Sequence, residues 1–352
     1  MKNTTKKLLA LPLILAMISA LAACGQTQST TADSEASASA AEIPAADEPA
    51  AYDSELPINI MVLNGTTGFG MANLIYAAQN GEAALNYNFS VETDASTITA
   101  ALVNGSTDIA ALPTNAASAL YNKTGGGVQV LALNTRGVLY LVSDGSVEIN
   151  GFADLEGQTV YVPAQNPTFI FEYLCSQNGL NPGENIIIDN TYAQPADLNA
   201  AVSSGEVSLA VLPEPMVTVA LSANEKLSAV LDLTAEWDNV APAGSLVQGC
   251  VVVRTDFAKE HPAELACFLD EYGDSVEALS SDVQGSAEKI QETGIFAKAP
   301  VAAKAIPNCN VCFITGTDMK SALSTFLDIM YDVAPASVGG ATPGDDFYCI
   351  LG

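Results

Sequence analysis

The feature that most constrains the fold is an alternation of strand-like and helix-like segments that the chain runs through twice. Each series closes on a short apolar segment that ends in proline, at 109–113 in the first series and at 209–213 in the second. Strands that alternate with helices favour an α/β fold with mainly parallel sheets. In open sheets of this kind, ligands bind beyond the carboxyl ends of the strands.

Apolar periodicity and turn residues predict the individual elements. Strands are predicted at 58–63, 86–91, 109–112, 128–133, 138–142, 159–162, 186–188, 207–212, 230–233 and 248–253. Helices are predicted at 69–79, 96–103, 114–121, 166–177, 194–203 and 215–223, with a turn or short helix at 151–157. After residue 255 the pattern is mostly helical, with irregular stretches around 300–315 and after 334.

Because the two series share one layout, the sequence predicts two similar lobes. The first lobe comprises 56–142 and 247–352, and the second lobe, 143–246, is inserted into it. The chain then crosses between the lobes near residues 142 and 246. The carboxyl ends of the strands could face each other across a cleft, which is where we expect a ligand.

A leader segment precedes the lobes. Three lysines lie within its first seven residues, and the apolar run 8–22 is too short for a comfortable membrane-spanning helix. The run ends in Leu-Ala-Ala-Cys-Gly, in which Cys24 resembles the acylated cysteine of a bacterial lipobox. We expect residues 1–24 to be a lipoprotein signal peptide and acyl chains on Cys24 to form a membrane anchor. An ordinary signal peptide with a chance cysteine is the alternative.

Residues 25–55 contain mostly Ser, Thr, Ala, Asp and Glu and almost no large apolar side chain. Such a segment buries too little surface to offset its chain entropy. We predict that it is a disordered acidic tether between the anchor and the lobes.

Charge and motifs narrow the function. The chain has 12 basic and 40 acidic residues, a net charge of −28, so nucleic acid is not an expected partner. Its single histidine, His261, excludes mechanisms that need two, and its place before Pro262 favours a structural role. The sequence lacks G-x-S-x-G, H-E-x-x-H and the P-loop G-K-[ST]. We expect no catalysis, no cofactor and no metal.

Several segments resemble one known family. Residues 152–163 (FADLEGQTVYVP) resemble the opening of its second lobe, 112–113 and 212–216 (LPEPM) its cleft-edge turns, and 255–265 the helix after the return crossing. The family comprises solute-binding lipoproteins of ABC importers for nitrate, sulfonates, taurine and the thiamine pyrimidine precursor. The resemblance covers roughly 56–335. It implies a type II periplasmic-binding fold that closes around a small polar or heteroaromatic solute.

The same resemblance implies an extracytoplasmic location and, as partners, an ABC permease with its ATPase. Two alternatives remain. One is an enzyme with the periplasmic-binding fold, of the menaquinone-pathway dehydratase type, and the other is a ligand-sensing or adhesive surface lipoprotein without a transporter. The sequence identifies neither the solute, nor the permease, nor the type of cell envelope.

The turns that open helices are the candidate ligand-binding sites, because their free N–H groups and positive dipole ends favour anions or polar groups. The candidate residues are Asn64, Thr66, Thr67, Gly68, Thr114, Asn115, Gln165, Asn166 and Thr168. Ordinary turn formation and helix capping are the alternative interpretation of each.

Two charged residues lead to opposite expectations for the solute. Arg136 follows a strand end and is the first choice for a bidentate clamp on an anion. Glu214, at the cleft-edge turn, would repel an anion and would suit an amine or a ring N–H. A surface or inter-lobe ion pair for Arg136, and a helix-start glutamate for Glu214, are the alternatives. The charge of the solute therefore stays open.

Besides Cys24 the chain has six cysteines: Cys175, Cys250, Cys267, Cys309, Cys312 and Cys349. Export permits disulfides, and six cysteines allow fifteen pairings. Disulfides, one of them involving Cys349, and free buried thiols both fit the sequence. Cys309 and Cys312 form a C-x-x-C, which alone is a weak metal or redox signal because no second pair supplies four ligands.

Overall fold

The structure is a computed structural model that describes residues 51–351. The predicted signal peptide, Cys24 and most of the predicted tether lie outside the described residues. The strands are β1 (Pro57–Leu63), β2 (Asn86–Glu92), β3 (Ile109–Pro113), β4 (Val128–Arg136), β5 (Leu139–Ser143), β6 (Thr159–Tyr161), β7 (Ile187–Asp189), β8 (Leu209–Pro213), β9 (Ser228–Asp232), β10 (Val247–Arg254) and β11 (Val311–Ile314).

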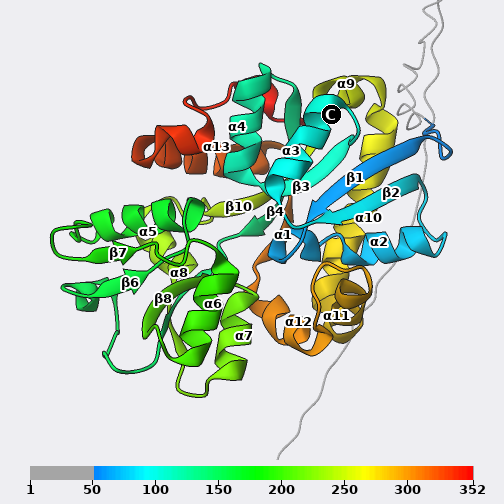
Figure 1. The fold of residues 1–352 in the computed structure, drawn as a ribbon. Helices are drawn as coiled ribbons and strands as arrows, with labels where there is room; N and C mark the ends of the chain where they lie inside the picture. The colour runs from blue at the N-terminus through cyan, green and yellow to red at the C-terminus, as the bar shows by residue number, and fades with distance from the viewer. Residues whose placement is uncertain (1–50, 352) are drawn as a thin grey trace, which may run out of the picture. The chain divides into compact units, whose positions relative to one another are not determined.

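Helices connect these strands (Figure 1). The α-helices are α1 (Thr66–Phe69), α2 (Ala72–Gln79), α3 (Ala95–Asn104), α4 (Thr114–Thr124), α5 (Asn166–Gln177), α6 (Pro195–Ser204), α7 (Met216–Ala223), α8 (Leu233–Val240), α9 (Thr255–Glu260), α10 (Pro262–Ser281), α11 (Val283–Glu292), α12 (Ala299–Ala305) and α13 (Gly316–Val333). Short 3₁₀ helices are η1 (Phe152–Leu155), η2 (Ile306–Asn308), η3 (Pro335–Val338) and η4 (Asp345–Phe347).

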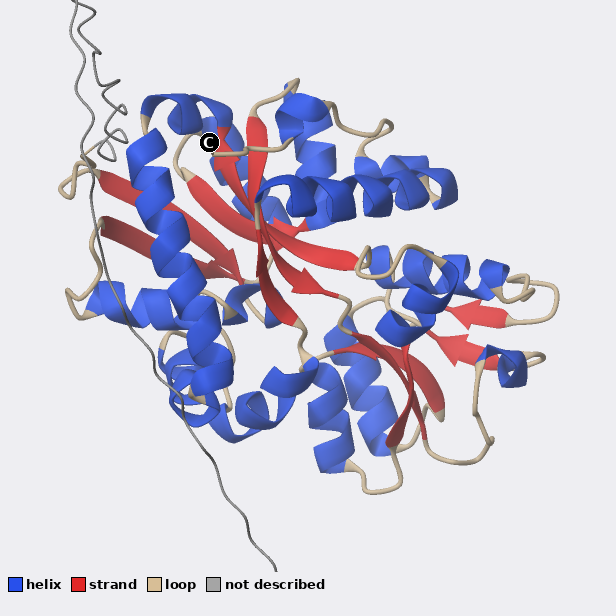
Figure 2. Cartoon of the chain, turned by 180° about the vertical axis from the view of Figure 1, so that it is seen from behind, coloured by secondary structure: helices blue, strands red, loops and turns tan. Residues whose placement is uncertain are grey.

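The strands of the described residues form two sheets, which Figure 2 shows in red. The first has the order β11-β4-β10-β3-β1-β2, and the second has the order β7-β6-β8-β5-β9. In the first sheet, β1, β2 and β3 are parallel, and β4 shares their direction because both β3 and β4 pair antiparallel with β10. By the same reasoning β6, β7, β8 and β9 share one direction in the second sheet. Each sheet therefore has one edge at which the carboxyl ends of four strands meet.

This architecture confirms the prediction of an α/β fold with two lobes. The path between the sheets differs from the expected one at its first crossing. The predicted strand 138–142 was expected in the first lobe, but the corresponding strand β5 pairs with β8 and β9 in the second sheet. The chain thus leaves the first sheet after Arg136, not near residue 142. Apolar periodicity identifies such a strand but not the sheet that it joins.

Three elements were not predicted. β11 and α12 lie in the stretch that was expected to be irregular, and α8 directly follows a predicted strand. The predicted helix 69–79 is two helices, α1 and α2, with Gly70 and Met71 between them. β11 has only four residues, and short elements of this kind carry too few periodic positions to be recognised.

Apolar side chains fill both faces of each sheet. On the first sheet, α3, α4 and α13 cover one face, and α2, α10 and α11 cover the other. On the second sheet, α5 and α8 cover one face, and α6 and α7 cover the other. One buried cluster is shared by α13 and by the helices α5 and α8, so the two lobes are joined by core packing. Trp237 of α8 lies in this junction, 5.8 Å from the ring of Phe326 of α13.

The end of the predicted tether belongs to the folded part of the chain. The backbone N–H of Asp53 donates to the Glu264 carboxylate at 2.9 Å, and the N–H of Leu56 donates to the Asp53 carbonyl. The long-range bond to α10 attaches this stretch, which the composition of the tether did not indicate. Among the helices of the described residues, none is long and apolar enough to cross a membrane.

Candidate functional site

The predicted turns lie at the carboxyl edges of the two sheets. β1 leads through Asn64 and Gly65 into α1, and β3 leads directly into α4. In the second sheet, β6 leads into α5, and β8 leads through Glu214 and Pro215 into α7. The sequence therefore placed its candidate turns at the edges where a ligand of an open α/β sheet binds.

Two of these turns, one from each sheet, are in direct contact. The Thr66 hydroxyl, at the start of α1, donates to the backbone carbonyl of Glu214 at 2.7 Å, and both residues are buried. Thr66 and Glu214 are 148 positions apart in the chain. This bond makes the α1 turn and the β8–α7 turn a direct contact between the lobes, which we call the seam.

Glu214 also closes the start of α7 with its own side chain. Its carboxylate accepts from the Thr218 N–H at 3.1 Å and from the Thr218 hydroxyl at 2.9 Å. Only 4% of the residue is exposed, and this burial raises the pKa of the carboxyl, although hydrogen bonds from Thr218 and Asn308 oppose the rise. The predicted helix-start role of Glu214 is thus present in the structure, within the seam.

The rest of the seam comes from the segment after α12. Cys309 is buried, with its Sγ 4.0 Å from the Thr66 hydroxyl. Burial raises the pKa of the Cys309 thiol well above its usual range, and the nearby Glu214 raises it further. The Tyr140 hydroxyl, from β5, donates to the carbonyl of Asn308 at 3.0 Å. Sequence reasoning missed this segment, since it lies in the stretch that was expected to be irregular.

Two predicted threonines use their hydroxyls inside their own lobes. The fully buried Thr114 donates to the carbonyl of Val247 at 2.8 Å. It does not cap α4, because Pro113 occupies the cap position. Thr168 donates to the carbonyl of Pro163 and accepts from the Asn190 amide, both at 2.8 Å. Asn190 follows β7 at the same carboxyl edge, and the sequence did not predict it as a candidate site residue.

Two predicted asparagines have buried oxygens without donors. The Oδ1 atoms of Asn115, at the second position of α4, and of Asn166, at the first position of α5, are buried and have no hydrogen-bond partner among the described residues. A buried oxygen without a donor is costly unless another molecule supplies one. Among the predicted site residues, these two amides have side-chain oxygens that no hydrogen bond of the described residues uses.

The turn before α5 has an unusual backbone. Asn166 was expected to cap this helix, but Gln165 occupies the cap position, with φ of 66° and ψ of −129°. A residue other than glycine in this region stores strain of about 1–3 kcal/mol, and such strain clusters at binding sites. Gln165 is exposed at the carboxyl edge of β6.

The α1 turn brings its other predicted residues into backbone contacts. The Asn64 N–H donates to the carbonyl of Glu92, and the Thr67 carbonyl accepts from the Asn134 amide at 3.0 Å. Gly68 approaches the backbone closely, because a Cβ there would lie 2.6 Å from the Leu63 carbonyl oxygen. A side chain at position 68 would therefore clash, so this position requires glycine. The side chain of Asn64 is exposed.

Arg136 lies at the carboxyl end of β4, where the chain crosses to the second lobe. It is the last residue of β4, and its side chain is exposed. Its guanidinium lies close to Gly244 in the return crossing, because a Cβ built on Gly244 would lie 3.4 Å from it. The same guanidinium lies beside Cys312, where burial raises the pKa of the thiol to about 11 and Arg136 opposes the rise. Among the described residues, Arg136 forms no salt bridge.

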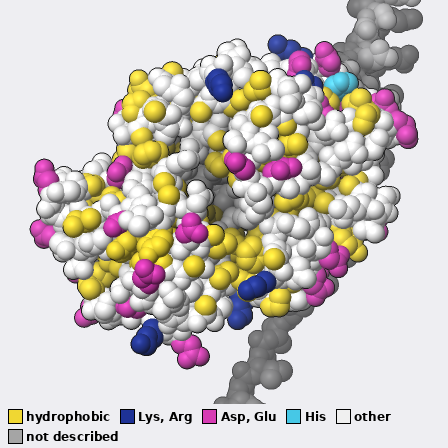
Figure 3. Space-filling model, viewed as in Figure 1, with side chains coloured by type: hydrophobic (Ala, Val, Ile, Leu, Met, Phe, Trp, Pro, Cys, Tyr) yellow, Lys and Arg dark blue, Asp and Glu magenta, His cyan; other side chains and the backbone are white. Residues whose placement is uncertain are grey.

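The face drawn in Figure 3 is hollowed near its centre, where α1, β4 and β10 approach the second lobe. Acidic side chains border this hollow on the drawn face, whereas the basic side chains lie farther away, near the upper and lower ends of the face. The hollow and the seam are the candidate solute site.

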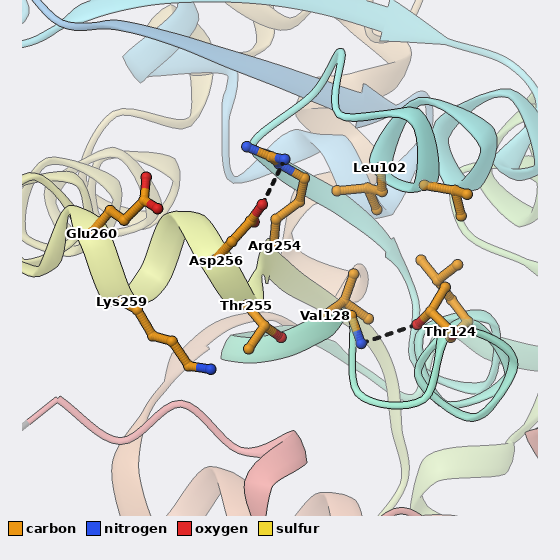
Figure 4. A pocket seen from close by; sticks show the side chains of 11 residues that line it. Leu102, Thr124, Val128, Arg254, Thr255, Asp256, Lys259 and Glu260 are labelled. Carbon is orange, nitrogen blue, oxygen red and sulfur yellow. Dashed lines mark hydrogen bonds and ion pairs between the residues drawn. The ribbon is translucent and has the colours of Figure 1, made fainter.

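A second hollow, of about 470 Å³, lies at the opposite edge of the first sheet (Figure 4). Leu102, Thr124 and Val128 line one side, and Arg254 with α9 lines the other. Two carboxylates, Asp108 and Asp256, each bind the guanidinium of Arg254 at 3.1 Å. This charge is therefore balanced within the protein, and the hollow lies away from the edge at which β1, β2, β3 and β4 end.

All six cysteines of the described residues are free thiols in the structure. In the same part of the chain, no group of three or more His, Cys, Asp and Glu side chains could hold a metal ion. His261 begins α10, and its Nδ1 lies 3.9 Å from the Glu264 carboxylate. Its ring centroid lies 4.6 Å from that of Phe257, a packing role at the junction of α9 and α10.

The fold is that of the two-lobed periplasmic-binding proteins. An ABC transporter protein from Parabacteroides distasonis aligns with a TM-score of 0.71 and 23% identity, over 84% of this chain and 99% of its own. The periplasmic aliphatic sulphonate binding protein SsuA from Escherichia coli aligns with a TM-score of 0.65 and 15% identity, over 81% and 90%. A ligand-binding component of an ABC-type import system from Staphylococcus aureus aligns with a TM-score of 0.62 and 16% identity, over 84% and 97%.

The family described as NMT1/THI5 like matches residues 69–282, more than half of the chain, and the chain belongs to this family. The resemblance found in the sequence is thereby confirmed. A comparison with curated protein sequences returned no match.

Proposed function

We propose that this chain is the solute-binding component of an ABC importer. It captures a small polar or heteroaromatic solute between its lobes and delivers it to a permease, which works with an ATPase. Structural neighbours described as ABC transporter and sulphonate-binding proteins support this function, as does the family. The single observation that carries it is the contact of two strand-to-helix turns, one from each sheet, beside a hollow at their carboxyl edges.

The mechanism is a two-state hinge without covalent chemistry. In the state described, the Thr66–Glu214 bond closes the seam. Opening at the two crossings, after Arg136 and before Val247, breaks this bond and admits the solute. A solute that contacts both lobes then favours the closed state by its differential affinity for that state.

The membrane anchor is part of the same proposal. Acyl chains on Cys24 hold the chain at the outer side of the cell membrane, and residues after Cys24 link the anchor to the lobes. Local tethering raises the effective concentration of the loaded protein at the permease. Mass analysis of the mature chain from its own cells tests the acylation directly.

Solute binding can be tested with the chain's one tryptophan, Trp237. Its ring lies between Tyr173, at 4.7 Å, and Phe326 of α13, at 5.8 Å, so it senses the junction of the lobes. A bound solute that alters the hinge should change the emission of Trp237 in a saturable way and raise the melting temperature. The Trp237→Phe variant should lose the optical signal and keep the thermal shift.

Import is tested separately from binding. Cells that lack the chain should lose high-affinity uptake of the solute that the titration identifies, and reintroducing the gene should restore it. Binding without any effect on uptake would instead favour the ligand-sensing lipoprotein.

A further inference from the structure

Asparagines that are followed directly by glycine are prone to deamidation, the spontaneous conversion of the side-chain amide to a carboxylate. The backbone nitrogen of the following residue attacks the side-chain carbonyl carbon, so this nitrogen must be available and closely approachable. Glycine favours the attack because it has no Cβ to obstruct the approach. The chain has five such asparagines, all of them exposed: Asn64, Asn80, Asn104, Asn150 and Asn178.

Three of the five pairs lie where a helix ends, at the ends of α2, α3 and α5. The N–H groups of Gly81, Gly105 and Gly179 each donate to a carbonyl of the preceding helical turn. The side chains of Asn80 and Asn178 are engaged as well, because each amide donates to the carbonyl four residues earlier, at 2.8 Å. At these pairs, the attacking nitrogen is already used in a hydrogen bond.

The fourth pair, Asn64 and Gly65, lies beside the seam. The Gly65 N–H donates to the carbonyl of Ile295, in the segment after α11, at 3.2 Å. The attack on Asn64 would therefore require this long-range bond to break first.

The fifth pair, Asn150 and Gly151, lies in the loop between β5 and η1. The Gly151 N–H donates no hydrogen bond among the described residues. The Asn150 side chain makes one long bond, 3.3 Å from its Nδ2 to the exposed Glu148 carboxylate. The loop itself is held in place, because the Asn150 N–H donates to the Asp154 carboxylate at 2.7 Å and Ile149 is buried.

The backbone of Gly151 also differs from that of the other four glycines. Its φ is −176°, an extended conformation that any residue adopts, whereas the other four have φ between 70° and 79°. A Cβ built on Gly151 would meet no atom within 4 Å. The fold therefore tolerates a side chain at this position, which makes a clean test variant possible.

We propose that Asn150 is a site of spontaneous deamidation in the folded chain and that the fold protects the other four pairs. The Gly151 nitrogen forms a bond to Cγ of Asn150, the Cγ–Nδ2 bond breaks, and ammonia leaves with the proton of the Gly151 N–H. Water then opens the resulting succinimide ring at either carbonyl, which leaves aspartate or isoaspartate at position 150. No electrons are transferred, and water is the only co-reactant. This modification does not depend on the proposed function.

The product adds a carboxylate to a loop that already has two at this point. The Nδ2 donor that faces Glu148 becomes a negatively charged oxygen, and Asp154 is bonded to the N–H of the same residue. Like charges repel, although solvent screening keeps the effect small at an exposed surface. In the isoaspartate product the main chain is longer by a methylene group, which displaces the N–H that binds Asp154. Deamidation should thus loosen the loop before η1 without unfolding the lobe.

Peptide mass mapping of the purified full chain measures the reaction. One sample is kept in warm, mildly alkaline buffer, and a second is kept in the same buffer with enough urea to unfold the chain. In urea we expect all five asparagines to deamidate at similar rates. In the folded chain we expect Asn150 to react at least about fivefold faster than each of the other four, because their hydrogen bonds must break before the attack.

Two variants identify the nucleophile and the site. Gly151→Ala should slow deamidation at position 150 by about tenfold or more, because the methyl group obstructs the attacking nitrogen. Asn150→Gln should remove the reaction at this position, because the attack would need a larger ring. Both variants should melt at the temperature of the fresh wild-type chain, since position 150 is exposed and position 151 has room for a Cβ.

Three results would overturn the proposal. One is a folded chain in which Asn150 stays intact while the urea sample deamidates. Another is a folded chain in which Asn64 or a helix-end asparagine reacts as fast as Asn150. The third is an unchanged rate at position 150 in Gly151→Ala, which would mean that the Gly151 nitrogen is not the nucleophile.

Discussion

The turns after β3 and after β8 begin from nearly the same sequence and end in different contacts. Both strands close on Leu-Pro, at 112–113 and 212–213. After β3, Thr114 enters α4 at once, and its hydroxyl binds Val247 of the neighbouring strand. After β8, the Glu214 carboxylate accepts from the Thr218 N–H in the first turn of α7, and its backbone carbonyl accepts from the Thr66 hydroxyl of the other lobe.

The difference shows how one strand-to-helix layout can serve two purposes. The β3–α4 turn is held within its own lobe, so its contacts persist when the lobes part. The β8–α7 turn makes the seam, so its contact with Thr66 depends on closure. Variants at the two turns should accordingly separate stability from solute affinity.

The largest effect is expected at Thr114. Thr114→Val keeps the shape of the side chain but leaves the buried carbonyl of Val247 without its donor, which should cost about 2 kcal/mol of unfolding free energy. Urea unfolding measures this loss, and solute affinity should stay within about twofold. Thr67→Val, at a half-buried neighbour of the seam, is the control and should change stability by less than about 0.5 kcal/mol.

A smaller effect on a different property is expected at Thr66. Thr66→Val removes the bond that exists only in the closed state, at a cost of about 1 kcal/mol. Only the closed state loses this hydrogen bond, so the variant shifts the equilibrium towards the open state, and solute affinity should fall about fivefold. Titration of Trp237 emission measures the change. An affinity equal to that of the wild type would mean that the seam does not contribute to closure.

The smallest effect concerns pH. Burial raises the pKa of Glu214 above its ordinary value of 4.5, so the folded chain holds this proton more tightly than the unfolded chain. The resulting stability is fully present below pH 4.5 and is lost as pH rises through the folded pKa. Relative to Glu214→Gln, the wild type should therefore gain stability as the pH falls from 7 towards 4.5.

Asp94, the cap of α3, provides a control of opposite sign. Hydrogen bonds from Ser96 lower the pKa of Asp94 below its ordinary value of 3.8. Its contribution is present above pH 3.8 and is lost as the pH falls through the folded pKa. Relative to Asp94→Asn, the wild type should thus lose stability on acidification. Urea unfolding at several pH values compares both pairs, and the same slope in both would contradict the account of Glu214.

The fold was largely predictable from the sequence because its elements repeat a local pattern. Apolar runs such as 58–63 and 109–112, separated by helical periodicity, identify strands that the structure confirms as β1 and β3. The pattern did not show that β5 joins the second sheet, because pairing depends on residues about 70 positions away, such as Leu212 opposite Tyr140. It also missed the four-residue strand β11.

The candidate site was predictable only as a set of turns. Proline, asparagine and glycine after the strands indicated where backbone N–H groups gather at the sheet edges. The sequence could not show that Thr114 would bind Val247, 133 positions away, or that Thr66 would bind Glu214. Which hydroxyls remain available for a solute is set by such long-range partners. The opposing expectations for Arg136 and Glu214 could be weighed only once their surroundings were known.

Reactivity of Cys309 tests the central claim, closure of the seam on a solute, most directly. Its thiol is buried beside Thr66 and Glu214, whereas Cys250 is buried in the sheet, with its thiol near the carbonyl of Leu112. Alkylation of each thiol by iodoacetamide is followed by mass spectrometry, with and without a solute that binds. The account predicts that Cys309 reacts without solute and that saturating solute slows it at least about tenfold, while Cys250 stays slow throughout. Equal rates at Cys309 with and without bound solute would contradict closure at this seam.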